Sequence, residues 1–200
     1  MANVNAPAGL VPVEYQNGAP WTGGGRVYYI AADDTNPYSI GDVVKSSGDG
    51  DANGVAGVTL GTAGAAMRGV IVSMGGPAYG GVLGDVNNLN IIQIPATKTQ
   101  AYYVLVVDDP NVIFEIQEIG TGTLLTSAAI GLNANFVYAA PATGVLVSGT
   151  QLDNTTEATD SSLNLKILGL SQRPGNAFGQ YQKWLVLPNN HELRAGTTGV

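Results

Sequence analysis

Short runs of β-branched and aromatic residues, each ended within a few residues by Gly, Pro, Asn or Asp, most limit what this chain can fold into. Runs of this length and spacing are typical of strands joined by turns. The 28 glycines, 10 prolines and 44% hydrophobic residues fit an all-β protein with many short strands. The predicted strands cover residues 26–31, 39–45, 55–60, 67–73, 89–94, 101–107, 111–118, 135–139, 145–148, 163–170 and 183–187. Their spacing predicts a sandwich or barrel of short antiparallel strands with at most one short helix.

Two neighbouring runs differ in their patterns. Residues 101–107 are apolar on both faces, which predicts a strand in the centre of a sheet. Residues 111–118 alternate, with Phe114 on one face and Glu115 and Gln117 on the other, which predicts a half-solvated strand. The Asp-Asp-Pro-Asn stretch at 108–111 predicts a tight connection between them.

The sequence offers one short helix and two long loops. Thr126 is placed to cap a helix over residues 126–130, and Gly131 is placed to stop it. Gly-rich stretches at 46–54 and 74–88 predict long loops, which in general carry contacts or are mobile.

The first 25 residues predict an extended N-terminal arm. Pro7, Pro12 and Pro20 oppose a helix, and three consecutive glycines at 23–25 end the segment. We therefore divide the chain into an arm, 1–25, and a β-rich body, 26–200, with a weak division of the body near residue 120.

The arm has two interpretations, a disordered tail or a segment that docks on a neighbouring subunit. Its apolar residues favour docking, because a solvated tail would lack them. The candidate partner-binding residues are Leu10, Val11, Val13, Tyr15 and Trp21, and the first three are also a candidate short edge strand.

Charge and composition exclude several classes of function. The net charge of −7 disfavours binding to nucleic acid and to anionic membranes. There is no cysteine, so disulfides and thiolate metal sites are excluded. The opening residues lack a positive segment followed by an apolar one, which argues against a secretory signal, and the longest apolar run is too short to span a bilayer.

One short motif matches only part of a metal-binding pattern. Residues 49–54 read D-x-D-x-N-G, the first half of a calcium loop, but Leu60 stands where the bidentate acid belongs. A solvated Asp- and Gly-rich turn explains the same letters, and the sequence leaves calcium binding open. We predict no cofactor and assign no metal ligand.

Catalytic patterns are also incomplete. His191 is the sole histidine, which excludes a zinc site of several histidines, and no G-x-S-x-G motif accompanies it as part of a triad. The acid pairs at 33–34 and 108–109 are sequence neighbours, whose side chains point to opposite faces of a strand. We therefore predict no enzyme and no catalytic residue.

Segments throughout the chain carry a resemblance. They are residues 1–13, 17–21, 28–30, 40–44, 68–72, 103–110 and the closing stretch 163–193, where two strand-like runs flank a polar turn with Arg173, Pro174 and Gly175. Together they resemble the small virion proteins of tailed bacteriophages, and in particular the capsid decoration proteins, also called cement or head-auxiliary proteins. The resemblance implies no binding residue.

The resemblance implies a structural protein on the outer surface of the virion. Such a protein binds the major capsid protein of an assembled shell, stabilises it, and is usually a trimer or dimer. The acidic charge agrees, because it suits the outside of a DNA-filled head better than the inside. Two alternatives remain: a head-fibre or tail-type module that recognises host glycans, and, less favoured, a hydrolase that uses scattered carboxylates.

Overall fold

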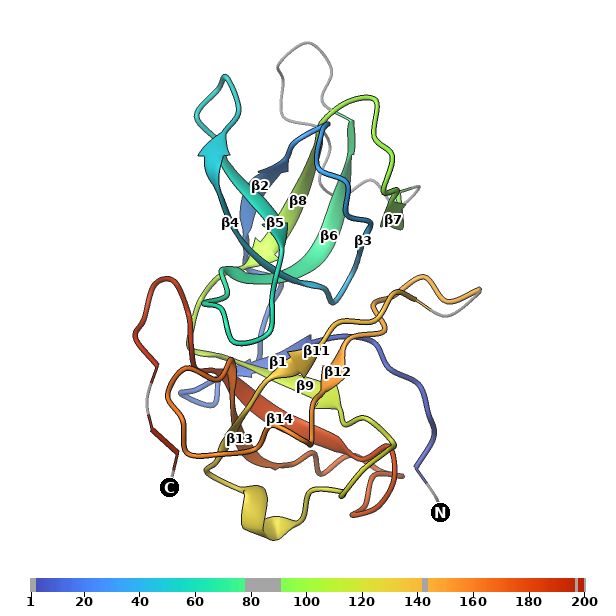
Figure 1. Ribbon diagram of the computed structural model, residues 1–200, viewed down its shortest axis with the longest axis vertical. Helices are drawn as coiled ribbons and strands as arrows, with labels where there is room; N and C mark the ends of the chain where they lie inside the picture. Colours follow the sequence, from blue (N-terminus) through green and yellow to red (C-terminus); the bar gives the residue numbers. More distant parts are fainter. Residues whose placement is uncertain (1–2, 78–90, 142–143, 197, 200) are drawn as a thin grey trace.

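The computed structural model describes residues 3–77, 91–141, 144–196 and 198–199. Figure 1 shows two β-rich units stacked along the long axis, a barrel above and a sheet-based unit below. The prediction of an all-β fold of short strands is confirmed. Among the described residues the helical part is one 3-10 turn, η1 (Ser127–Ala129), where Thr126 caps the first turn by accepting a hydrogen bond from the Ala128 N–H.

The barrel closes in the strand order β2-β5-β4-β6-β8. Its strands are β2 (Arg26–Ile30), β4 (Val43–Gly50), β5 (Ala56–Leu60), β6 (Gly69–Pro77) and β8 (Tyr102–Val107). All neighbours are antiparallel except β2 and β5, which meet at one parallel pair, Tyr29 and Gly57. A small antiparallel ladder of β3 (Tyr38–Ser39) and β7 (Gln93–Ile94) lies beside the barrel.

The lower unit is a five-stranded sheet in the order β1-β9-β14-β13-β10. Its strands are β1 (Val11–Tyr15), β9 (Val112–Gln117), β10 (Asn133–Ala134), β13 (Leu165–Leu170) and β14 (Lys183–Pro188), and β11 (Phe136–Val137) pairs with β12 (Gln151–Leu152) beside them. The chain leaves the barrel at β8 and enters the lower sheet at β9. The change of unit therefore falls at residues 108–111, before the division predicted near residue 120.

The predicted strand patterns are mostly confirmed. β8 is central, as its apolar faces predict, because it pairs with β2 on one edge and β6 on the other. The stretch at 46–54 is not a long loop, because β4 continues through it to Gly50 and pairs with β5 in a hairpin whose turn covers residues 51–55. Residues 145–148 do not form a strand and make one isolated parallel bridge, Val147 to Ile40. Of the loop predicted at 74–88, residues 74–77 belong to β6, and 78–88 lie outside the described residues.

β9 is not half-solvated. Phe114 and Ile116 pack in the core as the alternation predicts, but Gln117 on the opposite face is also buried. Its side chain contacts the N-terminal segment, donating to Asn5 Oδ1 and accepting from the Ala6 N–H. The second face of this strand is therefore covered by residues far away in the sequence.

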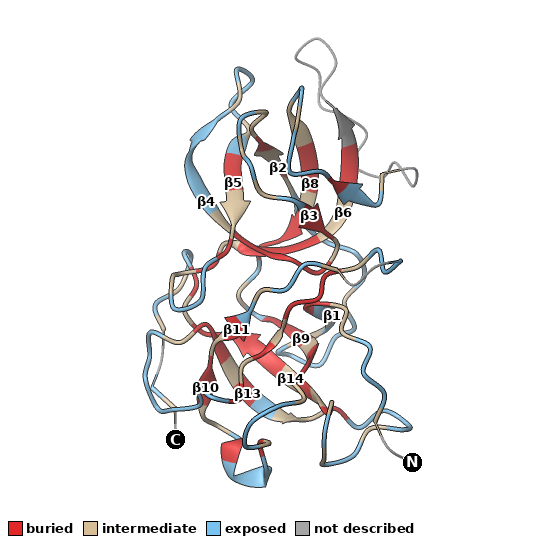
Figure 2. Ribbon diagram, turned by 45° about the vertical axis from the view of Figure 1, so that its right-hand side comes forward, coloured by how far each residue is buried: buried red, intermediate tan, exposed pale blue. Residues whose placement is uncertain are grey.

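One apolar cluster joins the two units. Val43, Met67 and Val70 of the barrel belong to the same buried cluster as Phe114 and Trp184 of the lower sheet. Figure 2 shows the buried segments at the base of the barrel facing those of the lower unit. A second cluster, built around Ile30, Val58 and Val104, fills the barrel itself.

Candidate functional site

The N-terminal segment is part of this chain's own fold rather than a free arm. β1 pairs antiparallel with β9 as an edge strand, which confirms the predicted edge strand at 10–13 to within two residues. The outer edge of β1 carries a short return, in which the Trp21 N–H donates to Val13 O and the Tyr15 N–H donates to Ala19 O. The segment predicted to dock on a neighbour therefore docks on its own sheet.

The five candidate partner-binding residues differ in how far they are buried. Leu10 is 1% exposed and lies in the core that joins the two units, so it is not a surface residue here. Tyr15 and Trp21 are partly buried and pack against the same core. Val11 and Val13 are each 41% exposed, so the edge strand presents these two apolar side chains to solvent.

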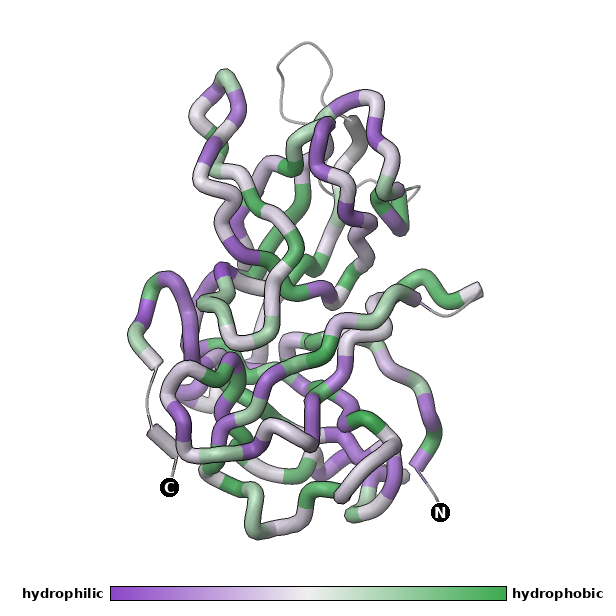
Figure 3. Tube along the Cα trace, viewed as in Figure 1, coloured by the Kyte–Doolittle hydropathy of each residue, from purple (hydrophilic) through white to green (hydrophobic). Residues whose placement is uncertain are grey.

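The largest cavity described here lies beside the barrel, between the β3–β7 ladder and the loop of residues 139–148. Its volume is about 530 Å³, and none of the described residues that line it is charged. Tyr38 and Ile94 form its buried wall, while Val145 and Leu146 are 39% and 48% exposed at its rim. Figure 3 shows hydrophobic positions on the described parts of this loop, residues 139–141 and 144–148. The groove and the exposed pair on β1 are two apolar surfaces that a binding function could use.

In the calcium-like loop of residues 49–54, the Asp51 carboxylate is occupied by hydrogen-bond donors of the protein itself. Asp51 accepts hydrogen bonds from the backbone N–H groups of Asn53 and Val55, from Asn53 Nδ2 and from the Tyr103 hydroxyl. These hydrogen bonds, of which the one from Tyr103 has the largest effect, lower the pKa of Asp51. Among the described residues no group of three acidic or histidine side chains is placed to hold a metal ion.

The candidate catalytic residues are not brought together. His191 is 3% exposed, and its Nδ1 accepts a hydrogen bond from the Leu193 N–H. Burial lowers the pKa of His191. Asp34 and Asp108 turn to separate partners, Lys98 and Tyr28 respectively, while Asp109 accepts from the N–H of Asn111 in the predicted turn.

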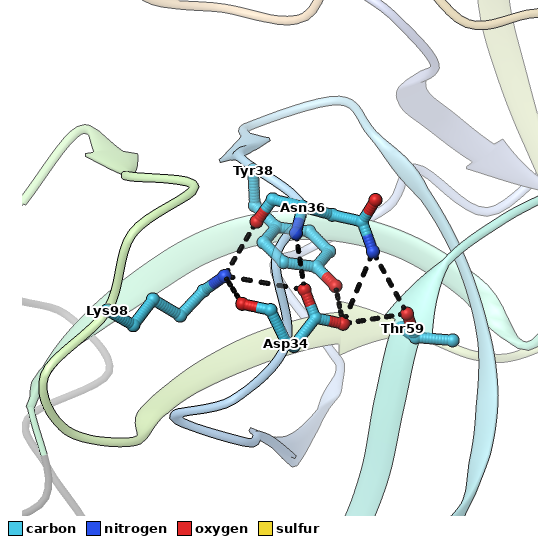
Figure 4. A network of polar contacts seen from close by, with 5 residues as sticks. All are labelled: Asp34, Asn36, Tyr38, Thr59 and Lys98. Carbon is cyan, nitrogen blue, oxygen red and sulfur yellow. Dashed lines mark hydrogen bonds and ion pairs between the residues drawn. The ribbon is translucent and has the colours of Figure 1, made fainter.

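Four polar networks, three of them built on buried groups, could not be predicted from the sequence. The first, shown in Figure 4, surrounds Lys98, whose side chain is fully buried. Its ammonium donates to the backbone carbonyls of Asp34 and Asn36 at 2.6 and 2.7 Å and lies 3.3 Å from the Asp34 carboxylate. Burial raises the pKa of Asp34, but hydrogen bonds from Asn36, Thr59 and Tyr38 and the charge of Lys98 outweigh it, so this pKa is lowered. This network ties two loops at one end of the barrel.

The second and third networks cross from the barrel to the lower unit. Asp42, in the turn before β4, accepts from the Ser148 hydroxyl at 2.5 Å, and burial raises the pKa of Asp42 to about 6. On another side, Glu192 accepts from the Ser46 N–H at 2.7 Å and lies 3.6 Å from the Arg68 guanidinium. Together with the shared core, these contacts fix the two units against each other.

The fourth network surrounds Glu118 at the end of β9, which is 0% exposed. Its carboxylate accepts four N–H donors, from the backbone of Leu125 and the side chains of Asn154, Gln182 and Trp184. Donors of this kind stabilise a buried carboxylate without a cation. The chemistry of the network is therefore structural.

Comparison of the chain with protein-family models, with curated proteins and with solved structures finds no significant match. In the described part of the chain, no helix has the length and hydropathy needed to cross a membrane.

Proposed function

We propose that this protein is a structural virion protein that binds the outer surface of an assembled phage capsid and stabilises contacts between subunits of the major capsid protein. The observation that carries the proposal is the use of the buried titratable groups. Asp42, Glu118 and Lys98 each join distant parts of the fold through hydrogen bonds. Side chains that are costly to bury thus stabilise a rigid β body, as a structural protein requires.

The resemblance described above supplies the virion context, and the surface supplies the means of attachment. Val11 and Val13 present apolar side chains on an edge strand, and the groove between the β3–β7 ladder and residues 140–141 and 144–146 provides a second surface. Complete burial of one valine contributes about 1.5–3 kcal/mol, so covering the exposed two-fifths of each side chain adds about 1 kcal/mol. Repetition over a lattice multiplies such weak contacts into avidity, and a homo-oligomer adds further copies.

The first test is co-sedimentation of the purified protein with mature shells stripped of it. Deleting residues 1–25 is unsuitable, because it removes β1 from the sheet and Leu10 from the core. The double substitution Val11→Ser with Val13→Ser keeps the strand and removes the exposed apolar surface. We expect saturable binding of the unchanged protein at a fixed ratio to the major capsid protein, and about thirtyfold weaker binding per copy for the double variant, which loses about 2 kcal/mol.

Ile130→Ser is the matched control, because Ile130 is similarly exposed at 44% but lies beside η1 in the lower unit. Equal binding by the double variant and the unchanged protein would remove β1 from the contact surface. Failure of the folded, unchanged protein to bind shells would overturn the proposal and direct the search to host glycans.

A further inference from the structure

A second cavity, on the lower unit, gathers positive charge in a chain that is acidic overall. Its volume is about 300 Å³, and it lies between the N-terminal residues, the start of β14 and the turn that precedes β14. It is lined by Asn3, Val4, Ala6, Arg173, Pro174, Gly175, Asn176, Tyr181 and Lys183. The closing polar turn noted in the sequence therefore forms one wall of this cavity, which we call the Arg173 cavity.

Two asparagines fix the walls of the Arg173 cavity. Asn3 donates to the carbonyls of Ala177 and Gln180 and accepts from the Ala177 N–H, so it holds the N-terminal segment on the turn. Asn176 donates to the carbonyls of Ser171 and Lys183 and accepts from the Lys183 N–H. These contacts use both N–H donors and the carbonyl oxygen of each side chain, so the cavity is organised before any ligand arrives.

The wall at Tyr181 is held in an unfavourable backbone conformation. Tyr181 has φ +61°, the one positive φ of a residue other than glycine in the described part of the chain. Its ring packs directly on Gly120, where an added Cβ would lie 2.0 Å from the ring. A non-glycine residue in this conformation costs free energy, and residues strained in this way cluster at ligand sites.

The charges of the Arg173 cavity do not cancel. Arg173 and Lys183 lie 2.7 and 3.7 Å from one carboxylate oxygen of Glu115, so two cations face one anion and one positive charge is left. Among the described residues the Arg173 guanidinium is bonded to Glu115 alone, through Nη1, and its side chain is 53% exposed. A guanidinium has five N–H donors, so most of them remain for a ligand.

We propose that the Arg173 cavity binds a carboxylate carried by a polypeptide, namely an acidic side chain of an extended segment. Arg173 pairs with the carboxylate, Lys183 adds a second positive charge, and Val4, Ala6 and Pro174 contact the methylenes of the side chain. A polypeptide is favoured over an acidic sugar because the volume is at the small end for ligand cavities and suits one side chain. Packing of the Tyr181 ring on Gly120 also limits its use as a stacking platform. The proposal does not rest on shell binding.

The test is a titration of the ¹⁵N-labelled full chain, followed by amide NMR shifts, with the peptides acetyl-Gly-Glu-Gly-amide and acetyl-Gly-Gln-Gly-amide. The two peptides differ only in the carboxylate. We expect saturable shifts at residues 173–177 with the Glu peptide, and at least about tenfold weaker binding of the Gln peptide. Arg173→Gln should weaken binding of the Glu peptide about tenfold. It should leave the amide shifts elsewhere in the chain unchanged, because Glu115 keeps Ser171 and Lys183 as partners.

Lys45→Gln is the matched control, because it removes one positive charge from the barrel and should leave binding unchanged. Equal shifts with the two peptides, or the same affinity after Arg173→Gln, would overturn the proposal. So would tighter saturation of the cavity by methyl glucuronoside than by the Glu peptide, which would assign it to acidic sugars.

Discussion

The indole of Trp184 donates its Nε1–H to the carboxylate of Glu118 at 2.8 Å, and both residues are 0% exposed. Trp184 is among the largest fully buried side chains, so its polar nitrogen needs a partner inside the core. Glu118 supplies that partner and also accepts from Leu125, Asn154 and Gln182. One carboxylate thereby joins the end of β9 and β14 to three connecting segments, which hold Leu125, Asn154 and Gln182.

Glu118→Gln should destabilise the protein by about 3 kcal/mol. The amide replaces one acceptor oxygen with an NH₂ group that faces other N–H donors, and buried donors left unpaired are costly. Urea unfolding at pH 7 measures the change, with Glu157→Gln as control, because Glu157 is exposed and should change stability by less than about 0.5 kcal/mol. Equal stabilities of the two variants would show that the Glu118 network contributes little.

Asp42 should make the protein less stable as the pH rises. Its pKa is raised by burial from 3.8 to about 6, so between these values the folded state binds more protons than the unfolded state. The contribution of Asp42 to the free energy of unfolding is therefore largest below about pH 4, falls by up to about 3 kcal/mol as the pH rises to about 6, and is constant above.

The measurement is urea unfolding of the unchanged protein and of Asp42→Asn from pH 4 to pH 7. Subtracting the two curves removes the contributions of other groups, including Asp34 and Asp160, whose lowered pKa values act in the opposite direction at lower pH. The stability of the unchanged protein relative to the variant should fall across this range. A difference that stays flat would contradict the raised pKa.

Lys98→Met should cost about 3–5 kcal/mol, because it leaves the largely buried Asp34 carboxylate without its cation. The loss should depend little on salt, since a buried pair is poorly screened. Thermal or urea unfolding at low and high ionic strength measures it, with Lys45→Met, at a partly exposed position, as control. A loss of stability below about 1 kcal/mol would mean that the Lys98 ammonium contributes little to the network around Asp34.

Gly41→Ala should destabilise the protein more than Gly54→Ala. Both glycines have positive φ, 95° and 82°, so both substitutions carry a similar backbone cost of about 1 kcal/mol. At Gly41 the added Cβ would also lie 2.2 Å from the Ala8 carbonyl oxygen, whereas at Gly54 it would meet open space. Chemical unfolding of the two variants isolates the packing of the N-terminal segment on the barrel, and equal losses would exclude this close contact.

Local sequence patterns predicted most of the strands, because each strand carries its own signal. The apolar run at 102–107, the alternation at 112–117 and the cap at Thr126 need no information from elsewhere in the chain. The patterns did not reveal that the chain forms a closed barrel and a separate sheet, because pairing between distant strands has no local signature. β10 and β12, with two residues each, are too short to show a period.

The candidate site was less predictable for the same reason. The burial of Leu10 and the pairing of β1 with β9 depend on a strand about 100 residues away, so the apolar N-terminal residues pointed equally well to a neighbour. The sequence alone suggests that Glu118, Asp42 and Lys98 are surface residues. Their burial is tolerated because partners that are distant in the sequence offset its free-energy cost. Arg173 and Pro174 were noticeable in the sequence, but the cavity they line needs Asn3 and Lys183 as well.

The most direct test of the structural role is the heat-rupture temperature of capsid shells stripped of this protein, measured with and without the protein added back to saturation. The account predicts binding at a fixed ratio to the major capsid protein and a higher rupture temperature. Folded protein that leaves the rupture temperature unchanged, whether it binds or not, would contradict a stabilising role.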